Sequence, residues 1–65
     1  MCEANAYIER EGREVLVMEG VFVVKTEAGA AGSSRVVLEN IFGEQRVLEA
    51  AISRISLMEH KIVFK

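Results

Sequence analysis

The sequence predicts an all-β fold, a small antiparallel barrel of the SH3-like or Sm-like sort with six or seven short strands in one domain over residues 1–65. Three observations predict it. Apolar residues make up 51% of the chain and many of them are Val or Ile, which are enriched in strands. Apolar and polar side chains alternate with a period of two along much of the sequence. Residues typical of turns separate the short apolar runs, as in small barrels.

The first half of the chain contains three predicted strands. Residues 4–9 alternate between apolar and polar side chains, and a turn follows around Gly12, because glycine accepts a positive φ. Residues 14–19 and 21–26, separated by Gly20, are apolar on both faces. In so short a chain, strands with two apolar faces predict a barrel interior on one side and a partner on the other.

The second half begins with a predicted loop and continues with further strands. Residues 27–34 are rich in Gly, Ala and Ser, which indicates a flexible hairpin loop. Strands are expected at residues 35–39 and 45–48, on either side of a turn at residues 40–43. The last expected strand covers residues 62–64.

The segment 48–58 has two interpretations. Its apolar residues fall partly at helical spacing. From Ile52 onward, however, Ile55 and Leu57 alternate with polar residues, as in a strand. We favour the strand, because the flanking segments are strands and a chain this short cannot hold a helix without losing a strand of the barrel.

The composition argues against several classes of function. The longest strictly apolar run, residues 21–24, is far shorter than the roughly 18 residues of a membrane helix. Acidic residues interrupt the first dozen positions, so we expect neither a membrane segment nor a secretory leader. The protein is therefore expected to be cytoplasmic. One Cys, one His and no Asp leave few ways to assemble catalytic groups, so we do not expect an enzyme.

The size of the chain favours self-association. A chain of 65 residues usually needs a disulfide, a metal or a partner subunit for stability. The single cysteine excludes an intrachain disulfide, and the absence of proline leaves every strand edge unblocked. With surplus apolar faces, this predicts a homodimer, the commonest closed assembly.

Cys2 is the most informative single residue. Its thiol lies one residue from the terminal amine, so sulfur and nitrogen could chelate one metal ion. A planar set of sulfur and nitrogen donors suits Ni(II) or Cu(II) better than zinc, and one cysteine is too few for a closed zinc site. In a dimer, two Cys2 thiolates could meet at one ion. The alternative, which spacing alone favours, is a small apolar thiol without a role.

His60 is the only imidazole of the chain. An imidazole can bind a metal or act as a pH switch. Its only carboxylate neighbour in sequence is Glu59, so we expect a hydrogen-bonded turn residue before Lys61 instead.

Small barrels often bind RNA, and RNA binding is therefore the alternative function. The net charge of −2 has the wrong sign for this role. The basic residues are also scattered among glutamates and form no stripe interleaved with aromatic side chains.

Three segments of the sequence resemble one family: Met1-Cys2-Glu3-Ala4-Asn5, Leu38-Glu39-Asn40-Ile41-Phe42-Gly43-Glu44 and Leu57-Met58-Glu59-His60-Lys61-Ile62. The family is CooT, small nickel-binding accessory proteins linked to the maturation of carbon monoxide dehydrogenase. The resemblance covers essentially the whole chain. It implies a homodimer of Sm-like barrels in which the Cys2 thiolates of both chains hold Ni(II), with the backbone nitrogen at Cys2 completing a planar site. It also implies a client metalloenzyme that receives the nickel. Many members of the family have been labelled RNA-binding proteins, which keeps that alternative open.

Overall fold

The computed structural model describes residues 3–65, which form a single six-stranded sheet. The strands are β1 (Ala4–Arg10), β2 (Arg13–Ala28), β3 (Ser34–Asn40), β4 (Gln45–Leu48), β5 (Ile52–Ser56) and β6 (Lys61–Phe64). A single 3-10 turn, η1 (Ala30–Gly32), lies in the β2–β3 hairpin, and residues 3–65 contain no α-helix. The all-β prediction is therefore confirmed. The strand interpretation after Ile52 is also confirmed, because β5 begins there.

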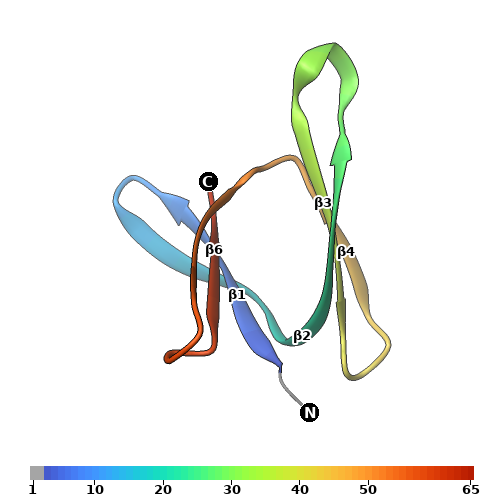
Figure 1. The fold of residues 1–65 in the computed structure, drawn as a ribbon. Coiled ribbons are helices and arrows are strands. Elements are labelled where there is room, and N and C mark those ends of the chain that lie inside the picture. Colours follow the sequence, from blue (N-terminus) through green and yellow to red (C-terminus); the bar gives the residue numbers. More distant parts are fainter. Residues whose placement is uncertain (1–2) are drawn as a thin grey trace.

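Strand β2 is longer than the sequence predicts. The expected strands at residues 14–19 and 21–26 are one strand of 16 residues. Gly20, with φ of +66°, bends this strand without ending it. The first part of β2 pairs with β1, the last part pairs with β3, and both ladders shift register near Gly20. Such bulges bend a strand and increase its twist, so β2 belongs to both sides of the bent sheet (Figure 1).

The order of the strands in the sheet is β4-β3-β2-β1-β6-β5. Neighbouring strands are antiparallel except β1 and β6, which run parallel from Asn5 beside Lys61 to Ile8 beside Phe64. The expectation of a purely antiparallel sheet is therefore wrong. The β5–β6 hairpin packs against β1 through its second strand, whose direction is the same as that of β1.

The sheet is not closed into a hydrogen-bonded barrel. Strands β4 and β5 are its two ends, and no ladder joins them in residues 3–65. Ala51, in the short link between these strands, instead exchanges two backbone hydrogen bonds with Lys65, of 2.8 and 3.0 Å. This pairing holds the link to the β6 side. The prediction of a closed barrel is wrong, because the sheet is open and strongly bent, with β1 and β6 on one side and β3 and β4 on the other (Figure 1).

The hydrophobic core lies on the inner face of this bend. Phe64, Leu38, Val36 and Val21 are almost completely buried there, together with Ala6. They come from four strands. Val36 and Leu38 both reach the core from β3, because alternate residues of a strand point to the same face. Burying each large apolar side chain contributes about 1.5–3 kcal/mol relative to leaving it exposed. The core thus holds both sides of the open sheet together without a closing ladder.

Candidate functional site

An apolar groove of about 360 Å³ opens beside the start of β1. We call it the N-terminal groove. Strand β2 and the β5–β6 hairpin supply its apolar walls: Val21, Phe22, Val24, Ile55, Leu57 and Ile62. Glu3 and His60 also line it. The groove therefore combines an apolar wall with a carboxylate and an imidazole.

Several apolar side chains of this groove are exposed to solvent. Leu57 is 83% exposed, and Phe22 and Ile55 are about half exposed. Met58, the next residue in the same turn as Leu57, is also almost fully exposed. Contiguous exposed apolar surface on a small protein marks an interaction site. The groove and the β5–β6 turn together have the properties of such a surface.

The β5–β6 turn is held against the start of β1. The amide of His60 donates to the carbonyl of Leu57 at 3.3 Å, and the carbonyl of His60 accepts from the amide of Asn5 at 2.8 Å. His60 has a φ of +52°, a conformation that residues other than glycine rarely adopt. The prediction that His60 lies in a turn before Lys61 is confirmed, and the hydrogen bonds described for it are those of its backbone. No three His, Cys, Asp or Glu side chains of residues 3–65 lie together as a metal-binding group.

Cys2, the predicted metal ligand, lies outside the described residues, as does Met1. Its neighbour in the sequence, Glu3, is the first described residue and lines the N-terminal groove. The role of Cys2 thus stays a prediction.

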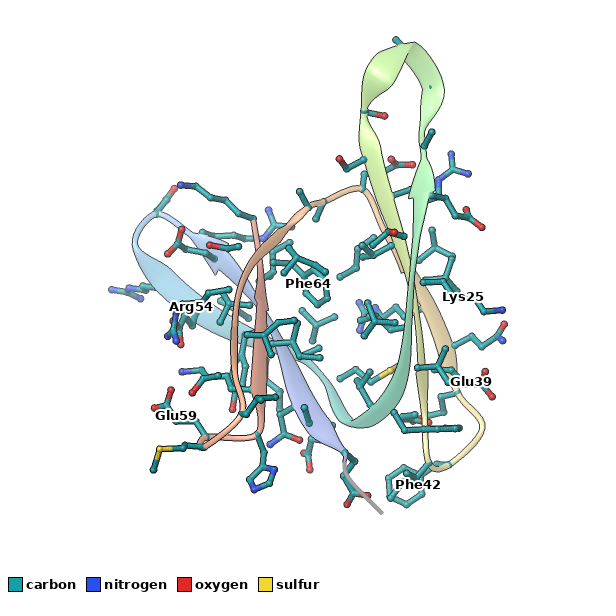
Figure 2. All side chains as sticks on the ribbon, viewed as in Figure 1. Lys25, Glu39, Phe42, Arg54, Glu59 and Phe64 are labelled. Carbon is teal, nitrogen blue, oxygen red and sulfur yellow. The ribbon has the colours of Figure 1, made fainter. Side chains whose placement is uncertain are left out.

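An ion-pair network fixes the β5–β6 hairpin from the outer face of the sheet. The Glu14 carboxylate contacts Lys61 Nζ and lies 2.8 Å from a guanidinium nitrogen of Arg54. Arg54 also lies 3.7 Å from Glu59 (Figure 2). Lys61 Nζ is 4.9 Å from the centre of the Tyr7 ring, within range of a cation–π contact. The network connects β2 with β5 and β6 across β1.

These contacts shift the pKa values of the participants. Hydrogen bonds from Lys61 and then Arg54 lower the pKa of Glu14, because they favour the charged carboxylate. The hydrogen bond to Glu14 raises the pKa values of Lys61 and Arg54. The sequence alone does not indicate this network. Glu14 and Lys61 are far apart in the chain, and only the pairing of β1 with both β2 and β6 brings them together.

Half of the basic side chains are paired with glutamates, which weakens the RNA-binding alternative. These four, Arg35, Arg54, Lys61 and Lys65, each lie within 4.0 Å of a glutamate carboxylate. Phosphate contacts require cations that are free to replace the counterions of the nucleic acid.

The part of the chain that the structure describes contains no helix long and apolar enough to cross a membrane.

Comparisons with known proteins identify the family. The family model of the CO dehydrogenase accessory protein CooT matches residues 1–65. A crystal structure from Carboxydothermus hydrogenoformans, whose description assigns it to CooT, is 38% identical in sequence and superposes with a TM-score of 0.76. That match covers 97% of this chain and 94% of the other. A comparison with curated proteins found no match. The resemblance noted in three segments thus extends over the full sequence and the fold, and the chain belongs to the CooT family of CO dehydrogenase accessory proteins.

Proposed function

We propose that this protein captures Ni(II) through the Cys2 thiolates of a homodimer and passes the ion to CO dehydrogenase. The observation that carries this proposal is the family match over residues 1–65, which includes the only cysteine of the chain at position 2. The protein acts as a carrier, with Ni(II) as its cargo.

The chemistry of the donors supports nickel as the cargo. A thiolate with nearby backbone nitrogens forms the planar sulfur–nitrogen environment that Ni(II) accepts. One thiolate per chain is a small donor set, and a second Cys2 from a partner chain doubles it. A cysteine thiol has a reference pKa of about 8.5, and it must lose its proton to bind. The affinity for nickel therefore increases with pH.

The exposed surface beside Glu3 supports the homodimer. The N-terminal groove exposes Phe22, Ile55 and Leu57, which a second copy of the chain would cover. Strand β5 is also an end of the sheet, with one edge unpaired in the described sheet. An interface at this place would bring the two Cys2 residues near each other, since each is bonded to a Glu3 that lines the groove. Nickel held by both chains would stabilise the dimer by mass action.

Calorimetric titration with Ni(II) tests the proposal. We expect the wild type to bind one Ni(II) per dimer and Cys2→Ser to lose this binding. Val47→Thr is the control, because Val47 is exposed and does not line the N-terminal groove. It is expected to bind nickel like the wild type. Undiminished binding by Cys2→Ser would remove Cys2 from the site, and a monomer in sedimentation experiments with nickel would exclude the shared site.

A further inference from the structure

The turn between β3 and β4 is held by one buried side chain. Asn40 is only 2% exposed. Its Oδ1 accepts hydrogen bonds from the amides of Phe42 at 3.1 Å and Glu44 at 2.9 Å. Its Nδ2 donates to Glu44 Oε1 at 2.7 Å. The side chain of Asn40 therefore fixes both the backbone of the turn and the residue that ends it.

Backbone hydrogen bonds fix the same turn further. The backbone amide of Asn40 donates to the carbonyl of Glu44 at 3.0 Å, and the backbone amide of Gly43 donates to the carbonyl of Asn40 at 3.1 Å. The amide of Ile41 donates at 2.9 Å to the carbonyl of Gly20, where β2 bends. The turn is thus attached to the sheet at its base and closed across its tip, so its conformation is set before any partner binds.

This rigid turn presents an aromatic ring to solvent. Phe42 is 73% exposed, although polar residues are the usual occupants of turns. A groove of about 470 Å³ lies beside it, and Leu16, also half exposed, contributes to its lining. In Figure 2, Phe42 lies at the lower right of the molecule, whereas Glu59 lies on the left. Interface hot spots include buried aromatic anchors, and an anchor on a backbone that is fixed before binding loses less entropy when it docks.

The groove beside Phe42 carries acidic groups. Glu19 and Glu44 both line it and are exposed. Its one basic residue, Arg46, donates through its guanidinium to the backbone carbonyl of Val17 at 3.1 Å. The surface therefore offers an apolar anchor next to carboxylates, and a complementary partner carries an apolar side chain beside a basic one.

We propose that Phe42 and this groove form the docking surface for the client enzyme, which we call the Phe42 surface. This inference rests on the proposed function, in which CO dehydrogenase is the client. A second copy of the chain fits this surface poorly, because a two-fold contact would place Glu19 and Glu44 of one chain against the same carboxylates of the other. No residue lines both this groove and the N-terminal groove. The protein can therefore hold nickel on one surface and the client on another.

Binding to purified, nickel-free CO dehydrogenase tests the apolar part of the surface. The enzyme is immobilised, and the binding of each variant is measured by biolayer interferometry. Phe42→Ser is expected to weaken binding about thirtyfold, the effect of truncating a hot-spot aromatic residue. Val47→Thr is the matched control. Val47 is also an exposed apolar residue, at 56%, but it does not line the groove, so its substitution leaves binding unchanged.

A pair of charge reversals tests the acidic part. Glu19→Lys and Glu11→Lys change the net charge equally, but only Glu19 lines the groove. We expect Glu19→Lys to weaken binding at least about tenfold at low salt and Glu11→Lys to change it little. Equal effects of the two variants would assign the attraction to net charge and contradict the proposed surface.

Nickel titration and sedimentation of each variant separate this inference from the proposed function. Phe42→Ser is expected to bind nickel and form dimers like the wild type. Wild-type affinity of Phe42→Ser for the enzyme would overturn the docking surface and leave nickel capture intact. A wild-type protein that binds nickel but does not bind the enzyme would also overturn the docking surface. Loss of the dimer in Phe42→Ser would assign this surface to a second copy. If circular dichroism shows that Phe42→Ser is unfolded, the comparison of Glu19→Lys with Glu11→Lys decides whether the enzyme binds at the Phe42 surface.

Discussion

Replacing Asn40 by alanine should destabilise the fold more than any substitution at an exposed turn position. Asn40→Ala removes three side-chain hydrogen bonds, to the amides of Phe42 and Glu44 and to the Glu44 carboxylate. At about 1 kcal/mol for each, the free energy of unfolding falls by roughly 3 kcal/mol. A domain of this size has about 3–10 kcal/mol in total, so a large share of its stability depends on one side chain.

Urea denaturation, followed by circular dichroism, measures this loss at a fixed protein concentration, because dimerisation affects apparent stability. Glu44→Ala is the partial control, since it removes only the contact between the Asn40 amide and the Glu44 carboxylate. We expect it to cost about 1 kcal/mol. The double variant should cost less than the sum of both, because the two single variants remove the same hydrogen bond. A loss below about 0.5 kcal/mol for Asn40→Ala, the range of ordinary surface substitutions, would refute this account of the turn.

Two further predictions concern the outer ion pairs and the bend in β2. The pKa of Glu14 is lower in the folded protein than its ordinary value of 4.5. Its contribution to stability is therefore complete above that value and is lost as the pH falls toward the folded pKa. Glu14→Gln should flatten the decrease of the urea midpoint as the pH falls below 4.5, and parallel curves for variant and wild type would contradict this. Gly20→Ala should lose roughly 1 kcal/mol or more, because a Cβ at this positive φ would lie 3.1 Å from Ile41 Cγ1. Gly12→Ala, also at positive φ but with no atom within 4 Å of its Cβ, should lose less in the same assay, and an equal loss would exclude the contact with Ile41.

The turn at residues 40–43 shows how far local sequence reasoning reaches. The Asn-Ile-Phe-Gly sequence predicts a turn there, and the turn is confirmed. That the Asn40 side chain organises it, and that Phe42 remains exposed, required the positions of the neighbouring backbone groups. The predicted site residue Cys2 depends on a family resemblance, and its contacts lie outside the described residues.

The alternation of apolar and polar residues by itself determined the all-β class and the position of most strands. These properties are local, because side-chain period follows from the conformation of consecutive residues. Only the tertiary structure decided that β1 and β6 run parallel, that Gly20 bends one strand, and that β4 and β5 do not pair with each other. The direction and neighbours of a strand depend on hydrogen bonds between distant segments, which the period of a single strand does not encode. For the same reason, the N-terminal groove and the ion pair between Glu14 and Lys61 emerge only when the hairpin of β5 and β6 packs beside β1.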